Sequence, residues 1–279
     1  MEKKIKIAMG QLLVEGGEPD RNIERAKSLI EEASKNNSNL ILLPECLDFG
    51  WTHPSSLKNA EPIPGKFSNI FCDLAKNNNI YICAGLTEKY KNKNYNSAIL
   101  IDNKGNILSK YRKINILKKA FEYYEVGQSL SVVDTIYGKI GLNICSDNYL
   151  DSIEIGIVLA RMGANIILTP SSWTVDYSIT EEDDPYKEKW IKPYKILSST
   201  FNMAVVSTTS VGYIVGGPFE GRKMIGCSVA INKNEILTKA VFNEFASDIK
   251  YIEFDVPNRK FKGTEIGEAL TAEKFYSWN

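Results

Sequence analysis

Three side chains in the sequence could act together as a nucleophile, a base and a positive charge: Cys145, Glu45 and Lys113. Each lies at the end of a segment with strand character. The carboxyl ends of strands are where α/β proteins gather their active sites. These residue types therefore suggest covalent chemistry at a thiol, assisted by a carboxylate and by a cation near developing negative charge.

The Cys145 segment is the most informative of the three. Gly138 and Gly141 punctuate a strand-like run that ends at Cys145, and polar residues 146–148 then open a helix-like segment. A thiol at such a turn is presented like the nucleophile of an elbow, and the next backbone N–H points at an oxyanion. A helix start also lowers the pKa of a nearby thiol. Taken alone, the segment slightly favours a buried structural cysteine.

Glu45 and Lys113 have ordinary alternatives when each is taken alone. Glu45 ends the apolar run LILLPE, and it could equally be an exposed loop carboxylate. Lys113 lies between apolar Ile114 and the strand-like residues before it, and a lysine in apolar surroundings stays charged only if it is paired. In a lysine-rich chain the alternative is a surface side chain.

The chain contains one histidine, His53. A catalytic dyad or triad built on Cys–His or Ser–His would have to use this histidine, and a zinc site of several histidines is impossible. The five cysteines include no close pair with metal-ligand spacing. We therefore expect no metal and no cofactor, with acid–base chemistry on Glu, Asp, Lys, Tyr or Cys. His53 follows Glu45 in a loop, and we expect it at the pocket mouth, contacting substrate rather than acting as the base.

Helices and strands alternate early in the chain, and hairpins follow in the middle and at the end. An apolar stripe predicts an amphipathic helix over 22–37: Ile23, Ala26, Leu29, Ile30 and Ala33. A second helix is predicted over 69–79, and others over 152–164 and within 179–202. Strands are predicted over 5–14, 39–44, 80–90, 131–147 around Gly138, 165–172, 203–214, 224–241 and 249–256, with a hairpin over 91–114. This order predicts an α/β fold with one mixed sheet or two, covered by helices. No linker or repeat divides residues 1–279, so one domain is expected.

Composition narrows the function classes. Lys plus Arg is 34 and Asp plus Glu is 34, so the formal net charge is +0. A general nucleic-acid binder normally carries a basic excess. No apolar run approaches about 18 residues, so no membrane helix is expected. The start of the chain is too short and polar-interrupted for a signal peptide. Together with unpaired cysteines, this predicts a reduced, cytoplasmic protein.

Taken together, LLPE, YRKI and NICSD occur in this order, each at a strand end, and the chain resembles the nitrilase superfamily of carbon–nitrogen hydrolases. The likeness runs from IKIAMGQL through AEPIPGKF, IYICAGLTE and NSAILIDNKGNILSKYRK to EGRKMIGCSVAINKNEIL. Its most specific part is GKIGLNICSDNY continuing to PSSW. The resemblance implies a four-layer α-β-β-α sandwich of two mixed sheets. It also implies a homodimer or larger even assembly, paired through the helices after Cys145 and Pro185.

The resemblance also implies a mechanism. Cys145 attacks the carbon of an amide, carbamoyl or nitrile group, and Glu45 moves the proton to the leaving amine. Lys113 and the N–H of Ser146 hold the oxyanion. Nitrile-cleaving members usually have tryptophan after the nucleophile, so Ser146 favours a small linear amide or N-carbamoyl substrate. Nitrile hydrolysis, acyl transfer and a catalytically idle binding protein remain as alternatives.

The resemblance implies further residues around this site. Many members carry a second glutamate between the lysine and the cysteine, and here the matching stretch is AFEYYEVGQ. Counting back from the glycine without gaps reaches Ala120, so Glu122 is assigned on the assumption of a shortened loop, with Glu125 as the alternative. Trp173 is expected to wall the pocket. An acidic run at 181–184 would suit a cationic substrate, whereas Arg222 would suit a carboxylate.

Overall fold

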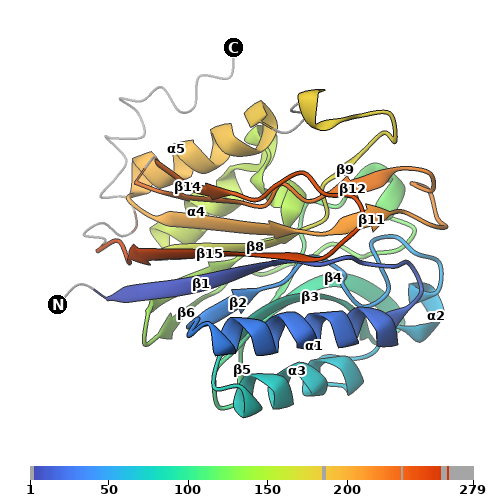
Figure 1. Ribbon diagram of the computed structural model, residues 1–279, viewed down its shortest axis with the longest axis horizontal. Helices are drawn as coiled ribbons and strands as arrows, with labels where there is room; N and C mark the ends of the chain where they lie inside the picture. The colour runs from blue at the N-terminus through green and yellow to red at the C-terminus, as the bar shows by residue number, and fades with distance from the viewer. Residues whose placement is uncertain (1–2, 184–186, 234, 259–262, 264–279) are drawn as a thin grey trace.

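The computed structural model describes residues 3–183, 187–233, 235–258 and 263. Two six-stranded sheets lie face to face, and helices cover their outer faces (Figure 1). One outer layer holds α1 (Pro19–Lys35) and α3 (Lys66–Asn77), and the other holds α4 (Glu154–Arg161) and α5 (Lys192–Phe201). A short helix, α2 (Ser56–Asn59), lies at one end. The expected four-layer α-β-β-α sandwich with two mixed sheets is confirmed.

The first sheet combines a parallel centre with antiparallel edges. Its strands, in spatial order, are β15 (Asp248–Asp255), β1 (Lys4–Gln11), β2 (Leu40–Leu42), β3 (Tyr81–Tyr90), β4 (Lys93–Ile101) and β5 (Ile107–Arg112). The strands β1, β2 and β3 are parallel, whereas β3, β4 and β5 form successive antiparallel pairs. Since β5 therefore runs in the direction of β3, the carboxyl ends of β2 and β5 point to the same end of the sheet.

The second sheet repeats this plan. Its order is β14 (Glu235–Lys239), β13 (Val229–Asn232), β10 (Ala204–Thr209), β8 (Ile166–Ser171), β7 (Gly138–Leu142) and β6 (Val132–Thr135). The central strands β7, β8 and β10 are parallel. A third, small sheet contains β11 (Val211–Tyr213), β12 (Lys223–Ile225) and β9 (Thr174–Val175). The single strand predicted over 203–214 is thus two strands, because the chain leaves the large sheet at Ser210 and enters the small one.

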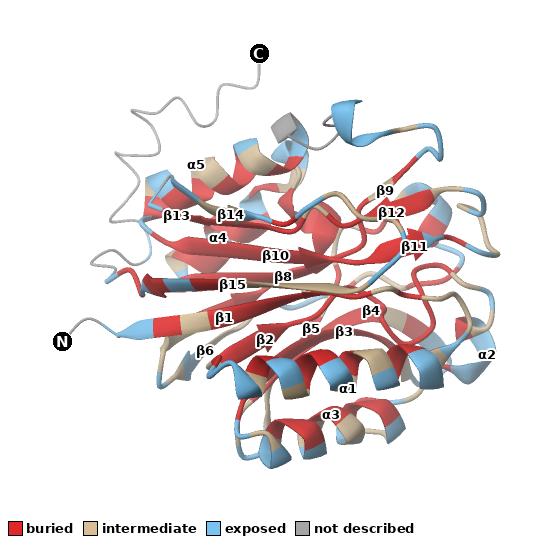
Figure 2. Ribbon diagram, viewed as in Figure 1, coloured by how far each residue is buried: buried red, intermediate tan, exposed pale blue. Residues whose placement is uncertain are grey.

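Alternating side chains divide the core into layers. On β1, Ile5, Ile7 and Met9 face the second sheet, whereas Ala8 packs under the helices. The apolar stripe of α1 is buried as predicted, although the helix starts at Pro19, a residue favoured in the first turn. In Figure 2 the central strands of the two large sheets are buried almost throughout, whereas the edge strands β6, β14 and β15 are partly exposed and the helices are buried only on their inner sides. Polar side chains at the strand ends therefore enter a site walled by two sheets.

Gly85 on β3 lets the segment that carries Glu45 pass directly over the strand. The Gly85 N–H donates to the Pro44 carbonyl at 3.0 Å, and the Gly85 carbonyl accepts the Leu47 N–H at 2.9 Å. A Cβ at this position would lie 2.5 Å from the Glu45 Cα and 2.6 Å from the Pro44 oxygen. Backbone atoms cannot move aside as a flexible side chain does. The close approach therefore requires glycine at this position.

We predict that Gly85→Ala destabilises the fold by about 3 kcal/mol, the upper range for overpacking a tight core. Gly141→Ala is the matched control, because a Cβ on that strand glycine meets only the Leu159 side chain, at 3.3 Å and beyond. Urea unfolding followed by circular dichroism measures both free energies of unfolding. Equal, small losses in the two variants would contradict the role assigned to Gly85.

Candidate active site

Glu45 is a fully buried carboxylate at the end of β2. The strand ends at Leu42, and Glu45 follows three residues later, with 1% of its surface exposed. Its Oε1 accepts hydrogen bonds from Lys113 Nζ and from Asn96 Nδ2, both at 2.6 Å. Its Oε2 is buried and has no hydrogen-bond partner among the described residues. One oxygen is thus held in place, and the other is free to take a proton.

Lys113 is the first residue after β5, and its side chain is 2% exposed. It shares the inner face with Tyr111, two residues earlier, because side chains alternate along a strand. The Lys113 N–H donates to the Asn96 carbonyl at 2.8 Å, which continues the ladder with β4. Burial opposes the ammonium charge, but the nearby carboxylate of Glu45, with Cys145 and Asp147, outweighs it and raises the pKa of Lys113 above its ordinary value.

Cys145 lies three residues beyond β7, in a turn whose backbone has φ of +46°. This left-handed conformation is uncommon for a residue other than glycine and fits the predicted elbow. The Cys145 N–H donates to Thr169 Oγ1 at 3.2 Å. Burial and then the Glu45 carboxylate raise the pKa of the Cys145 thiol to about 12, against the opposing effects of Lys113 and the Ser172 N–H. The resting thiol is therefore protonated at neutral pH.

The three predicted residues come together from both sheets. Glu45 and Lys113 follow strands of the first sheet, and Cys145 follows a strand of the second. The Glu45 N–H donates to the Ser171 carbonyl at 3.3 Å, and Ser172 Oγ donates to the Glu45 carbonyl at 3.2 Å. The end of β8 therefore joins the two sheets at the site. A thiol, a carboxylate and an ammonium share one buried space, which is an arrangement suited to nucleophilic acyl chemistry.

The structure places aromatic rings beside this space. Trp173 is 2% exposed, and its ring stacks on Trp190 with centroids 4.4 Å apart and an interplanar angle of 13°. Tyr149 lies 4.8 Å from the Trp190 ring. Burial raises the pKa of Tyr149 above its ordinary value, and Lys113 opposes the shift. Trp173 thus belongs to a cluster of three aromatic rings, of which Trp190 and Tyr149 were not singled out from the sequence.

Ser146 uses its side chain in the fold. Its Oγ donates to the Asn115 carbonyl at 2.7 Å, and its carbonyl accepts from Ser152 Oγ at 2.6 Å. The side chain is 1% exposed and is directed at the loop after Lys113. The hydroxyl of Ser146 is therefore committed to the fold.

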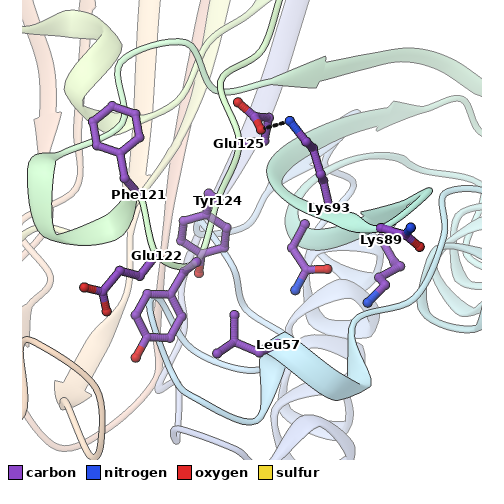
Figure 3. Close-up of a pocket in the computed structure, with 10 residues that line it drawn as sticks. Leu57, Lys89, Lys93, Phe121, Glu122, Tyr124 and Glu125 are labelled. Atoms are coloured by element: carbon purple, nitrogen blue, oxygen red, sulfur yellow. Dashed lines mark hydrogen bonds and ion pairs between the residues drawn. The ribbon is translucent and has the colours of Figure 1, made fainter.

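The structure does not bring Glu122 to the trio. Glu122 is exposed and lines a surface pocket of about 270 Å³, whose lining contains none of the trio (Figure 3). The chain makes a tight turn at Lys118–Ala120, and Ala120 is the residue buried there. Glu125, the alternative, pairs with Lys93 at the rim of the same pocket. The loop therefore presents its two carboxylates outward, and Ala120 inward.

His53 is half-buried and lies among turns rather than in the trio. Its Nδ1 is 2.8 Å from Ser55 Oγ. The imidazole packs on the backbone of Gly16 and Gly17, so closely that a Cβ on Gly17 would be 2.5 Å from His53 Cε1. Burial lowers the pKa of His53. These contacts fix the loop after Glu45, and none of them involves Glu45, Lys113 or Cys145.

The two electrostatic features considered for substrate charge differ in their surroundings. Residues Glu181–Asp183 form an exposed turn, and Asp184 is outside the described residues. Arg222 Nη2 donates to the Thr174 carbonyl at 3.3 Å, one residue after Trp173. Of the two, Arg222 is the group that hydrogen-bonds to a residue next to Trp173, namely Thr174.

Clusters of metal ligands and membrane-spanning helices are both absent from the described residues. No group of three or more His, Cys, Asp or Glu side chains is gathered as a metal site would require. Within the same residues, no helix has the length and apolar character needed to cross a membrane.

Comparison with known proteins agrees with this geometry. The sequence model of the family described as carbon-nitrogen hydrolase matches residues 6–257. A protein named nitrilase from Pyrococcus abyssi is 30% identical over 257 residues, which cover 90% of each chain. An omega-amidase of Mus musculus is 31% identical over 180 residues, 61% of this chain and 64% of that protein. The crystal structure of a Helicobacter pylori carbon-nitrogen hydrolase superposes with a TM-score of 0.80 at 23% identity, covering 99% of this chain and 95% of the other.

The match extends over most of the chain, and the two face-to-face sheets are those of the superposed hydrolase. The protein is therefore a member of the carbon–nitrogen hydrolase family, within the nitrilase superfamily.

Proposed function

We propose that the protein is a thiol-dependent hydrolase that cleaves the C–N bond of a small linear amide or N-carbamoyl compound. The observation that carries this proposal is the convergence of the Glu45–Lys113 ion pair, at 2.6 Å, with the Cys145 thiol in one buried space. A histidine is not needed, because Glu45 can move the proton and Lys113 can stabilise the negative charge.

In the first half of the reaction, Glu45 Oε2 takes the Cys145 proton as the sulfur attacks the carbonyl carbon. The new C–S bond places negative charge on the carbonyl oxygen, where the Lys113 ammonium and the Ser146 N–H hold it. Protonated Glu45 then gives its proton to the nitrogen, the C–N bond breaks, and ammonia or an amine leaves. An acyl thioester on Cys145 remains.

In the second half, water replaces the amine. Glu45 takes a proton from the water, whose oxygen attacks the thioester carbon, and the same two donors hold the second oxyanion. The C–S bond breaks and the thiolate recovers the proton from Glu45. The product is a carboxylic acid from an amide, or a carbamic acid from a carbamoyl compound. The raised pKa of Cys145 favours this return to the resting thiol.

The substrate class is supported by the walls of the site and by the relatives. Oxyanion donors on two sides suit a planar carbonyl group that becomes tetrahedral. The stacked pair Trp173–Trp190 limits the width on one side and favours a small or extended acyl group. The mouse relative is named an omega-amidase, and we propose an amide substrate here on that basis as well.

A homodimer formed through α4 and α5 is also part of the proposal. Val158 on α4 and Met162, the residue directly after the helix, lie four residues apart and are 41% and 42% exposed. Side chains four residues apart share one face of a helix. This apolar pair, on a helix that carries no further layer in Figure 1, supports pairing at that face.

The proposed function is tested by Cys145→Ala, which we expect to lower amide turnover by about 10⁶-fold while the protein remains folded. Turnover should be lost because the thiol is the sole nucleophile proposed. Ammonia release is measured over a panel of linear amides, ω-amides and N-carbamoyl compounds. Cys83→Ala is the matched control, since Cys83 is equally buried on the inner face of β3. Ammonia release above background by the Cys145 variant would overturn the mechanism.

The ionisation of Cys145 gives a second, independent prediction. With the thiol pKa raised to about 12, the thiolate fraction grows roughly tenfold per pH unit up to that value. Alkylation of Cys145 by iodoacetamide should therefore keep rising between pH 7 and pH 10, whereas a cysteine in a short unstructured peptide levels off near its pKa of about 8.5. The rates are read from the mass of intact protein. A plateau below pH 8 would show a resident thiolate held by Lys113 and would contradict base catalysis by Glu45.

A further inference from the structure

Asp147, two residues after the nucleophile, is a carboxylate with no exposed surface. Its Oδ1 accepts the Asn115 N–H at 2.9 Å, and its Oδ2 accepts the Ile144 N–H at 2.9 Å. The Tyr111 hydroxyl also donates to Oδ2, at 2.7 Å. One side chain therefore receives three hydrogen bonds from two segments of the chain.

These partners surround the catalytic groups in the sequence. Tyr111 lies two residues before Lys113, Asn115 lies two residues after it, and Ile144 immediately precedes Cys145. The Tyr111 oxygen also accepts the Ile114 N–H at 3.2 Å. The carboxylate thus joins the end of β5, which carries the lysine, to the turn that carries the thiol.

We propose that Asp147 is a positioning residue that sets the placement of Lys113 relative to Cys145, with Tyr111 as its main partner. This inference rests on the proposed function, because the placement matters only if the lysine and the thiol act on one carbonyl group. Asp147 itself does not touch substrate in this account. Its hydrogen bonds act through Lys113 and Cys145.

The physical need for this link comes from the turn at Cys145. A non-glycine residue at φ +46° is held there only when its surroundings over-determine the backbone. Asp147 fixes the N–H on one side of Cys145, and its own N–H donates to the Ile144 carbonyl at 2.9 Å. Ser146 adds a second tie to Asn115. The turn and the lysine-bearing loop therefore move as one unit.

The charge of Asp147 also favours the proposed chemistry. Lys113 must be an ammonium to hold an oxyanion, and Asp147 is one of the negative groups that raise its pKa. Buried charge–charge effects are screened less than surface ones. The carboxylate thereby helps to hold the lysine in its reactive state without occupying the space where substrate binds.

The test uses acrylamide, an amide that reports on the site without knowledge of the natural substrate. The Cys145 sulfur adds to the β-carbon, the thiol proton ends on the α-carbon, and the double bond becomes single. Negative charge develops on the amide oxygen during this addition. The Lys113 ammonium and the Ser146 N–H would stabilise it, as they would stabilise the oxyanion of hydrolysis. The rate of mass gain by one acrylamide, measured against acrylamide concentration, separates the maximal labelling rate from the half-saturating concentration.

We expect Tyr111→Phe to lower the maximal labelling rate of Cys145 roughly tenfold, and Asp147→Asn to lower it by up to about 10²-fold, because a displacement near 1 Å is sufficient for such losses. The half-saturating concentration should change less than about twofold, since binding of the amide does not depend on the alignment. Tyr81→Phe is the control, because Tyr81 is buried on the same inner face but packs on Tyr137.

The outcomes separate this inference from the proposed function. If the wild type neither gains the mass of one acrylamide at Cys145 nor releases ammonia from acrylamide, the nucleophile is misassigned and both fall. If the wild type is labelled and Tyr111→Phe is as fast as Tyr81→Phe, the positioning role is wrong and the hydrolase proposal stands. If the variant loses only the final amount of labelled protein at an unchanged rate, Tyr111 serves folding alone, and the inference is again overturned. Tyr111→Phe keeps the test decisive if Asp147→Asn does not fold.

Discussion

The ion pair between Glu45 and Lys113 is the interaction on which the rest of the site depends. Both side chains are almost fully buried, 2.6 Å apart. Removing two charges from water costs several kcal/mol per ion, and attraction offsets this only with good geometry and further hydrogen bonds. Asn96 supplies one such bond to Glu45. The glycine at position 85 lets the Glu45 segment come close enough to make the pair. The hydrogen bond from Asn96 and the close approach at Gly85 are thus features of the fold that allow this buried ion pair to exist.

The same burial explains how a protein with one histidine can arrange acid–base chemistry. In a dry site, a carboxylate next to a protonated thiol and an ammonium has strong electrostatic effects on both. The pKa of Cys145 is raised by burial and Glu45, and the pKa of Lys113 is raised by its carboxylate neighbours. The resting state is therefore a thiol, a carboxylate and an ammonium, with the proton one transfer away from Glu45. Two sheets packed face to face exclude water from this space, which a single sheet with one open face would not do.

Much of this arrangement could be predicted from the sequence. The apolar runs that end at Glu45 and Cys145 marked two strand ends, and the resemblance to the nitrilase superfamily implied the sandwich. Contacts across long sequence distances could not be predicted in the same way. Asn96 is 51 residues from Glu45, and its role follows from the pairing of β4 with β5. From the sequence, Asp147 was only a polar residue after the nucleophile. Its partners Tyr111 and Asn115 lie on and just after β5, the edge strand of the first sheet, so the contact could not be foreseen. Glu122 was assigned by counting along a loop, and the turn at Lys118–Ala120 directs it outward.

A double-mutant cycle on Glu45 and Lys113 tests the central claim most directly. Glu45→Gln, Lys113→Met and the double variant are unfolded in urea beside the wild type. If the pair organises the site, each single variant loses about 3–5 kcal/mol, because it leaves one buried charge without its partner. The double variant then loses much less than the sum of the two. Losses that add within about 0.5 kcal/mol would show that the two side chains are independent, and would contradict the account.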